Sequence, residues 1–182
     1  MFQKIRTVDN KVVDGIARLQ CVAMDKIMVM FTYAGTGAFI WWVVLALPFV
    51  LSAEYRKAGM TLIVALGVNY LLGEIIIKKA VRRARPSTLL PEDEMKINKP
   101  KDHSFPSGHS ASSFCAFAVT LICCPSFIWI PSLITAAIIA FSRLYLRVHY
   151  LSDVLVGTLL GLVDGAAIAL LFDRVVPVDL HF

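Results

Sequence analysis

Residues 151–172 read LSDVLVGTLLGLVDGAAIALLF, an apolar run interrupted by only two carboxylates. A helix that crosses a bilayer needs roughly 20 mostly apolar residues, and this stretch has that length. The rest of the chain has the same character, with 58% hydrophobic residues and a mean hydropathy of +0.71, whereas soluble domains are about half apolar. The sequence therefore predicts a membrane protein built from helices.

Four more apolar runs precede this one, so the sequence predicts five membrane spans: 27–51, 59–77, 109–124, 127–144 and 151–172. Short connections, such as the Cys-Pro-Ser turn at 124–126, favour antiparallel neighbours in one bundle. We predict an all-α fold, a polytopic membrane bundle of about five transmembrane helices, with residues 27–182 forming a single membrane domain.

The first 26 residues differ from the spans, because charged residues interrupt every apolar run. A cleaved signal peptide is therefore not expected. Apolar residues recur at helical spacing after a candidate helix cap at Asp9 and Asn10. This pattern favours an amphipathic interfacial segment over 1–26, with its charged face toward water and lipid headgroups. A helix that simply packs on the bundle is the alternative.

A cluster of cations follows the second span, where residues 78–86 read KKAVRRARP. Arginine can bind two phosphate oxygens with its planar fork, and lysine adds a compact charge, so Lys78 and Arg85 are candidate phosphate ligands. Taken alone, such a run is more often a membrane flank that contacts anionic headgroups. That flanking role is expected for the remaining cations, Lys79, Arg82 and Arg83.

The tetrapeptide PSGH at 106–109 lies where a polar loop becomes an apolar helix. Free backbone N–H groups gather at a helix N-terminus, and a glycine there lets an anion approach the backbone closely. Ser107 and Gly108 are therefore candidate phosphate-binding residues, and His109 can donate a proton to a leaving oxygen. An ordinary helix start is the alternative interpretation of these four residues.

His149 and Asp153 stand four residues apart at the head of the last span, so both can lie on one helix face. A carboxylate in that relation can accept the Nδ1 proton of the imidazole and leave Nε2 free to attack phosphorus. Arg143 precedes this pair at the end of the fourth span and is a third candidate phosphate ligand. An isolated His/Asp pair would more often be structural.

The three motifs occur together and in order, as Lys-x6-Arg-Pro, Pro-Ser-Gly-His and Ser-Arg-x5-His-x3-Asp. With five spans, the loops that carry them emerge on the same membrane face. This set resembles the type 2 phosphatidic acid phosphatase superfamily of integral membrane lipid phosphatases. The resemblance implies phosphate binding by Lys78, Arg85, Ser107, Gly108 and Arg143.

The resemblance also implies the catalytic roles. His149 would be the nucleophile that forms a phosphohistidine, Asp153 its orienting partner, and His109 the general acid that later activates water. The expected reaction is hydrolysis of a lipid phosphate or diphosphate with no metal or other cofactor, and no nucleic-acid partner is expected. The four cysteines have no zinc or redox spacing.

The expected substrate is a membrane lipid whose phosphate lies in water and whose tail stays in the bilayer. The short loops are similar to those of bacterial undecaprenyl-diphosphate phosphatases, which regenerate undecaprenyl phosphate for cell-wall synthesis. Phosphatidylglycerophosphate, phosphatidic acid, diacylglycerol diphosphate and lipid A 1-phosphate are the alternatives. A haloperoxidase of the same motif set would be soluble, and a lipid-phosphate-binding or transport protein would need no nucleophile.

Two indications of membrane orientation conflict. The face that carries the motifs and the N-terminus holds 15 of the 18 lysines and arginines, which by the positive-inside rule would place it in the cytoplasm. The resemblance implies an extracytoplasmic site. Because headgroup binding gives the cations a second role, we predict a multi-pass protein of the cell membrane with an extracytoplasmic active site.

Three further polar features have more than one interpretation. Glu74 lies one helical turn before Lys78 and can aim it toward a phosphate or simply form an ion pair with it. Asp164 lies deep in the last span and, with Asn69, either cross-links helices or belongs to a polar path. The loop 87–104 either covers the site or is a surface connection.

Overall fold

Each long apolar run of the sequence forms helix in the computed structural model, which describes residues 2–175, with side chains from residue 4 onward. No β-strand occurs among these residues, so the predicted all-α class is confirmed. In chain order the elements are α1 (Phe2–Ala17), α2 (Val22–Ala34), η1 (Thr36–Ala38), η2 (Trp41–Ala46), α3 (Leu47–Leu51), α4 (Arg56–Tyr70), η3 (Leu71–Ile77), α5 (Lys78–Val81), η4 (Pro86–Leu89), η5 (Glu92–Glu94), α6 (Gly108–Cys123), α7 (Ser126–Tyr145) and α8 (Leu151–Val175).

Three continuous helical segments are long and apolar enough to cross a membrane: Arg56–Val81, Ser126–Tyr145 and Leu151–Val175. The predicted first span is present but broken, because Val22–Ala34 and Thr36–Leu51 meet at an angle of 56°. Gly37 lies at this break with φ of +59°, a left-handed conformation that glycine adopts without strain. The predicted third span is α6, which is shorter than a full crossing.

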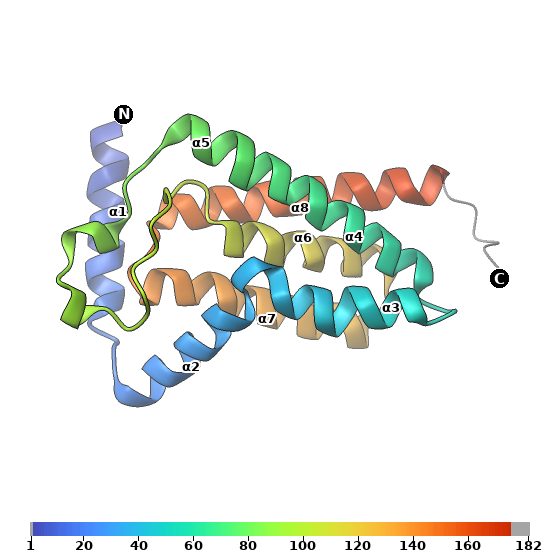
Figure 1. Ribbon diagram of the computed structural model, residues 1–182, viewed down its shortest axis with the longest axis horizontal. Coiled ribbons are helices and arrows are strands. Elements are labelled where there is room, and N and C mark those ends of the chain that lie inside the picture. The colour runs from blue at the N-terminus through green and yellow to red at the C-terminus, as the bar shows by residue number, and fades with distance from the viewer. Residues whose placement is uncertain (1, 176–182) are drawn as a thin grey trace.

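Helix α6 lies inside the bundle, where it contacts α4, α7 and α8 (Figure 1). Its contact with α8 is the most extensive in the molecule and runs along Gly157, Gly161 and Gly165. A Cβ atom added at Gly161 would lie 2.1 Å from the carbonyl oxygen of Ala111. The two backbones thus approach as closely as glycine allows, the arrangement that small residues at four-residue spacing favour between membrane helices.

A polar side-chain pair links the helices deeper in the bundle. The amide Nδ2 of Asn69 on α4 donates a hydrogen bond of 2.6 Å to Oδ2 of Asp164 on α8, and both residues are buried. The cross-linking interpretation of these two residues is therefore confirmed.

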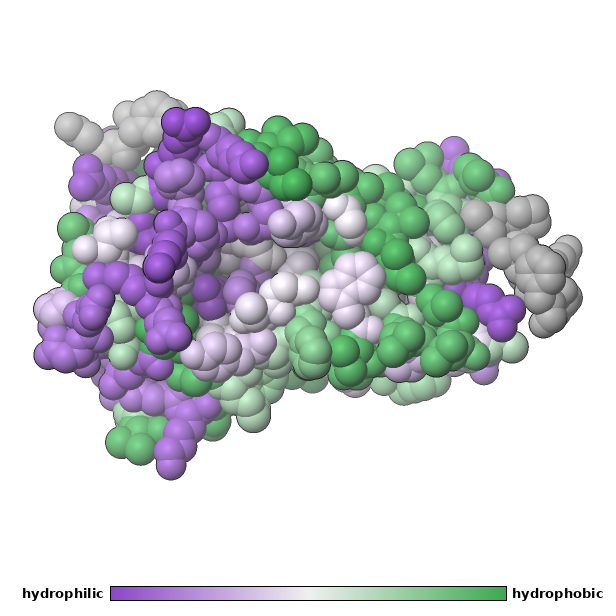
Figure 2. All heavy atoms as spheres, in the orientation of Figure 1, coloured by the Kyte–Doolittle hydropathy of each residue, from purple (hydrophilic) through white to green (hydrophobic). Residues whose placement is uncertain are grey.

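Helix α1 runs across one end of the bundle instead of along it, and its contacts are with α7 and α8 (Figure 1). Hydrophilic residues gather at that end, whereas apolar residues cover the sides of the long helices (Figure 2). This distribution agrees with an interfacial helix above a membrane-embedded bundle.

The predicted cap at Asp9 and Asn10 is wrong, because α1 begins at Phe2 and Asp9 lies in its middle. Asp9 is 2% exposed and shares the buried face of α1 with Val13, while Val8 is exposed. The buried position of Asp9 could not be predicted from the spacing of apolar residues, because that pattern assigns every charged residue to the exposed face of the helix.

Candidate active site

The three motifs meet around one cavity of about 610 Å³ at the polar end of the bundle. Its lining includes Lys78, Arg85, His109, Arg143 and His149. These residues come from the end of the second span, the loop after it, the start of α6, the end of α7 and the loop before α8. The prediction that the motif loops emerge on one face is therefore confirmed.

The local backbone explains how the first motif reaches the cavity. The segment Leu71–Ile77 is a π-helical turn, a widened geometry that often occurs at functional sites. Arg82 then adopts a left-handed conformation (φ 50°, ψ 39°) that ends α5. The chain after Arg82 turns back over the bundle end, and Arg85 is buried at 4% exposure.

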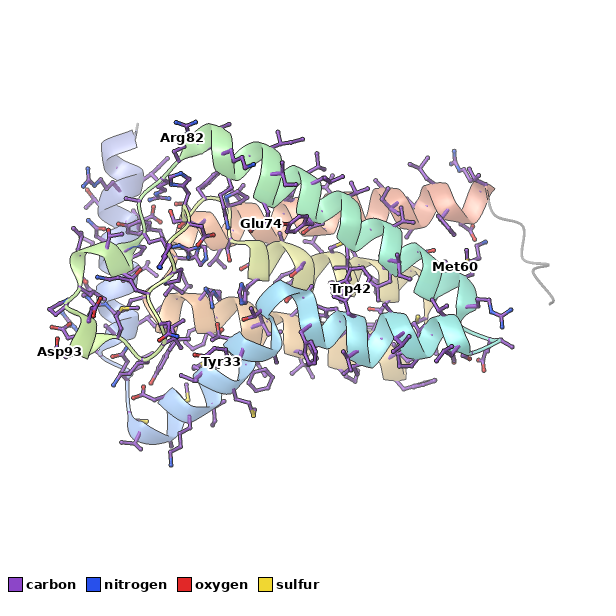
Figure 3. All side chains as sticks on the ribbon, in the orientation of Figure 1. Tyr33, Trp42, Met60, Glu74, Arg82 and Asp93 are labelled. Carbon is purple, nitrogen blue, oxygen red and sulfur yellow. The ribbon has the colours of Figure 1, made fainter. Side chains whose placement is uncertain are left out.

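Glu74 forms an ion pair with Lys78, a contact that both interpretations of this residue require. The ammonium Nζ of Lys78 donates to both carboxylate oxygens of Glu74 at 2.7 Å. Glu74 faces the start of α6 (Figure 3), and a Cβ atom at Gly108 would lie only 2.1 Å from its Oε1. Gly108 does admit an anion close to the backbone, and in this structure the anion is the Glu74 carboxylate.

Asp102 is a site residue that sequence reasoning missed. Its carboxylate accepts 2.8 Å hydrogen bonds from Nζ of Lys78 and from Nη2 of Arg85, and its carbonyl oxygen accepts from Nε of Arg85 at 2.9 Å. Burial opposes ionisation of Asp102, but its bonds to Lys78 and Arg85 prevail and lower the pKa of the carboxyl. Both cations thus already hold an anion.

His149 is fixed in one tautomer by its two hydrogen bonds. Its Nδ1 lies 2.7 Å from the carbonyl oxygen of Ser104, which can only accept, so Nδ1 carries the proton. Its Nε2 then accepts from Nη1 of Arg85 at 2.9 Å. Burial, and after it the charges of Arg85 and Arg143, holds the pKa of His149 well below its ordinary value. The imidazole is therefore neutral, the form in which Nε2 is nucleophilic.

Asp153 lies beside His149, but it is not the nearest partner of the imidazole. Its Oδ2 is 3.7 Å from Nδ1 of His149, farther than the Ser104 carbonyl. The carboxylate instead accepts from the backbone N–H of Tyr150 at 2.9 Å and from Nη1 of Arg83 at 2.6 Å. The orienting role expected for Asp153 is thus shared with a backbone carbonyl that no sequence motif could reveal.

His109 and Arg143 both contact Thr32 near the bend between α2 and η1. Nε2 of His109 donates to the carbonyl oxygen of Thr32 at 3.0 Å, and Nη1 of Arg143 donates to the Thr32 hydroxyl. Arg143 is 4% exposed, and its Nε has no hydrogen-bond partner among residues 4–175. A buried donor without a partner in a cavity wall is what an anion would satisfy.

Ser107 does not line the cavity. It is fully buried and caps α6, because its Oγ accepts from the N–H of Ser110 at 3.4 Å and from the Ser110 hydroxyl at 2.9 Å. Its backbone N–H donates to the carbonyl oxygen of Asp153 at 3.0 Å and so joins the starts of α6 and α8.

The loop 87–104 contributes to the site, since Ile97, Lys99 and Asp102 line the cavity. Ile97 and Met95 also pack on a buried cluster around Tyr145. Of the two interpretations of this loop, the covering role is therefore correct. The residues of the described chain include no group of three or more His, Cys, Asp or Glu side chains arranged to hold a metal ion.

The prediction that Arg83 contacts lipid headgroups as part of a membrane flank is wrong. It pairs with Asp9 at 2.7 Å and with Asp153 at 2.6 Å, both through its guanidinium nitrogens. Arg82 matches the flank better, since it is exposed and points away from the bundle (Figure 3).

Chemically, the cavity combines three fixed cations with a neutral imidazole and a second histidine. Cations of this kind stabilise the charge that spreads over phosphoryl oxygens in the transition state. A neutral Nε2 is a nucleophile for phosphorus, and a histidine on another wall can serve as acid and base.

Comparison with known proteins identifies the relatives of this site. A model of the PAP2 superfamily matches residues 58–176. An undecaprenyl-diphosphatase of Sulfolobus acidocaldarius is 31% identical over 142 residues, which cover 78% of this chain and 68% of that protein. A decaprenylphosphoryl-5-phosphoribose phosphatase of Mycobacterium tuberculosis is 31% identical over 159 residues, or 82% of this chain and 84% of the other.

A solved structure has the same fold. The crystal structure of a transmembrane PAP2 type phosphatidylglycerolphosphate phosphatase from Bacillus subtilis superposes with a TM-score of 0.77 at 23% identity. The superposition covers 94% of this chain and 88% of the other.

Proposed function

Because the chain belongs to the PAP2 superfamily and is a multi-pass membrane lipid phosphatase, we propose that it acts without a metal ion and through a phosphohistidine at His149. The observation that carries this proposal is the joint lining of one cavity by His149, His109 and three cations, Lys78, Arg85 and Arg143. Cations alone would suit a binding protein, whereas a neutral imidazole held among them suits covalent catalysis.

In the proposed reaction the phosphoryl oxygens replace the Asp102 carboxylate on Lys78 and Arg85. Nε2 of His149, released by Arg85, attacks phosphorus while the bond from phosphorus to the leaving oxygen breaks. His109 keeps its Nε2 proton on the Thr32 carbonyl, so it acts in this step as an imidazolium and gives its Nδ1 proton to that oxygen. It then takes one from water, whose oxygen attacks phosphorus and breaks the bond to His149, so inorganic phosphate is released and the imidazole returns.

We propose undecaprenyl diphosphate, cleaved to undecaprenyl phosphate, as the substrate. The Sulfolobus relative is named for this reaction, and the cavity extends past the cations to Trp42, Leu66 and Tyr70. These residues supply an apolar exit by which a long tail can reach the bilayer. Phosphatidylglycerophosphate, phosphatidic acid and lipid A 1-phosphate are the alternatives, and the Bacillus structure bears the name of a phospholipid phosphatase.

We propose further that the site faces the extracytoplasmic side of the cell membrane. The excess of cations at this end argues for the cytoplasm, yet three of them are largely buried in ion pairs with carboxylates of the chain: Lys78, Arg83 and Arg85. Cations in such pairs are less available as orientation signals.

The test is phosphate release by the purified protein in detergent from prenyl diphosphates, phosphatidylglycerophosphate and phosphatidic acid. Release should be unaffected by EDTA and should fall at least about a thousandfold in His149→Ala, because the nucleophile is lost. His103→Ala removes an exposed histidine of the covering loop and is the matched control. An alkaline quench should trap labelled phosphate on the wild-type protein only.

Two results would contradict the mechanism: a requirement for Mg²⁺ in the chemical step, or turnover retained in His149→Ala. A preference among the lipids by kcat/KM identifies the substrate.

A further inference from the structure

Asp9 on α1 is a buried carboxylate that none of the three motifs explains. It is 2% exposed on a helix whose other acidic residue, Asp14, lies on the exposed face. Burying a carboxylate is costly unless charge and hydrogen bonds compensate for lost hydration. The partners of Asp9 therefore indicate why it is there.

Three hydrogen-bond donors surround Asp9, and all come from residues at the active-site end of the bundle. Nη2 of Arg83 donates to its Oδ2 at 2.7 Å. The hydroxyl of Ser152 donates to the same oxygen at 2.6 Å, and the backbone N–H of Ser152 donates to Oδ1 at 2.9 Å. Burial opposes ionisation of Asp9, but the bonds from Arg83 and Ser152 prevail and lower the pKa of the carboxyl.

Arg83 connects Asp9 to the catalytic pair. While Nη2 binds Asp9, Nη1 donates to Oδ1 of Asp153 at 2.6 Å and to the Ser152 hydroxyl at 2.7 Å. The guanidinium also lies over the ring of Tyr150, 4.1 Å from its centroid. Because both of its terminal nitrogens are hydrogen-bonded and one face is stacked on a ring, the planar guanidinium has little freedom to move.

The connection ends at the nucleophile. The second oxygen of Asp153, Oδ2, accepts a hydrogen bond from the backbone N–H of Tyr150 and lies 3.7 Å from Nδ1 of His149. Residues 150–153 therefore form a short segment whose position is set by Arg83 on one side and by Asp9 on the other. His149 immediately precedes this segment.

Neither Asp9, Arg83 nor Ser152 lines the cavity. Phosphate in the cavity would touch Lys78, Arg85 and Arg143 but not the Arg83 guanidinium. Any effect of Arg83 on the reaction must then pass through Asp153 and the start of α8.

We propose that Asp9 and Arg83 are positioning residues of the phosphatase site, which make α1 part of the apparatus that aims His149. This inference rests on the proposed role of His149 as nucleophile. Small displacements of a nucleophile are costly in rate, because the reacting atoms must meet within a narrow range of distance and angle.

The test compares two variants with matched controls on the same elements. Arg83→Gln removes the shared fork, and Asp9→Asn removes its anchor on α1. Arg82→Gln and Asp14→Asn make the same chemical changes at exposed neighbouring positions. For each protein we would measure kcat and KM, and the inhibition constants for inorganic phosphate and for vanadate.

Arg83→Gln should lower kcat ~10- to 100-fold, the usual cost of losing a group that orients a reacting residue. Asp9→Asn should lower kcat about 3- to 10-fold, because Asp153 and Ser152 still hold the guanidinium. KM and the phosphate inhibition constant should stay within about threefold, since the cations that bind phosphate are untouched. Vanadate inhibition should weaken in step with kcat, because five-coordinate vanadate requires the aligned nucleophile.

The control variants should match the wild type in every measurement. Arg83→Lys should be active between wild type and Arg83→Gln, because it keeps the charge but can bind only one carboxylate well. In the double variant Asp9→Asn/Arg83→Gln, kcat should fall by less than the product of the two single effects, because the two residues share one ion pair. It should still lie somewhat below that of Arg83→Gln alone, because Asp9 also accepts hydrogen bonds directly from Ser152.

The inference is overturned if Asp9→Asn behaves like Asp14→Asn, or if Arg83→Gln raises KM and the phosphate constant while kcat is unchanged. A general loss of fold would lower phosphate and vanadate binding together and would also reject a positioning role. A wild-type protein that releases no phosphate, or one in which His149→Ala stays active, would instead reject the proposed function.

Discussion

The active-site cations of the free protein are neutralised by its own carboxylates. Lys78 is held by Glu74 and Asp102, and Arg85 by Asp102 and the imidazole of His149. Cations left bare in a cavity wall would be poorly solvated, so internal anions keep the site intact between substrates. Arg143, whose Nε is unpaired within the described chain, is the exception and offers an incoming phosphate its first new donor.

We expect His149 to stay neutral in the free protein as the pH falls through 6.5, the ordinary histidine value. Burial and the charges of Arg85 and Arg143 disfavour the imidazolium, so protonation requires a lower pH. Bound phosphate brings negative charge among the same cations and should move the pKa of His149 upward. The measurement is ¹⁵N NMR of histidine-labelled protein with and without saturating inorganic phosphate.

His149→Gln assigns the signal in those spectra, and the exposed His103 serves as a reference. The expected pattern at pH 6.5 without phosphate is a proton on Nδ1 only. An imidazolium pattern under that condition would contradict both the tautomer and the nucleophilic role.

Among the elements, the contact of α6 with α8 sets the geometry of the site. PSGH begins α6 and Asp153 lies in the first turn of α8, so sliding one helix along the other would separate the two halves of the cavity. The glycines at 157, 161 and 165 hold this register by close backbone contact. A widened contact would therefore affect both stability and catalysis.

Gly161→Ala should lower the free energy of unfolding by about 1–3 kcal/mol, the usual cost of overpacking a tight interior. The new methyl group would meet backbone atoms of Ala111 and Cys115, which cannot rotate away. Thermal unfolding in detergent measures the change. Gly15→Ala is the control, because no atom lies within 4 Å of a Cβ there, and we expect it to be neutral or slightly stabilising. Equal melting temperatures for both variants would refute the tight contact.

At the scale of the whole molecule, the sequence predicted the spans and motifs because both are local patterns. Apolar runs mark helices whatever their neighbours are, and Lys78, Arg85 and His149 lie in short motifs of fixed spacing. Asp102 and the pairing of Arg83 with Asp9 could not be predicted, because the paired residues are far apart in sequence and meet only in the folded chain. The break near Gly37 was missed because the apolar run was treated as one continuous span, although the Gly-Thr-Gly sequence at 35–37 is a local signal for an interruption.

Membrane orientation is a property of the whole chain, and the cysteines allow a test. Cys21 is exposed at the end of the bundle that carries the site, whereas Cys124 follows α6 at the other end. If the site is extracytoplasmic, an impermeant maleimide should label a variant that keeps only Cys21 in intact cells. A variant that keeps only Cys124 should react after permeabilisation alone. The reverse pattern would place the site in the cytoplasm.

The shortness of α6 has a consequence for which lipids fit. With 16 residues, α6 is about 24 Å long, roughly 6 Å less than the hydrocarbon layer. If the far end of α6 lies at the opposite headgroup plane, His109 lies several ångströms below the plane on the side of the site. A phosphate at the tip of a slender headgroup would then reach His109 more readily than one attached to a bulky group, and the kcat/KM values of the lipid panel measure that preference.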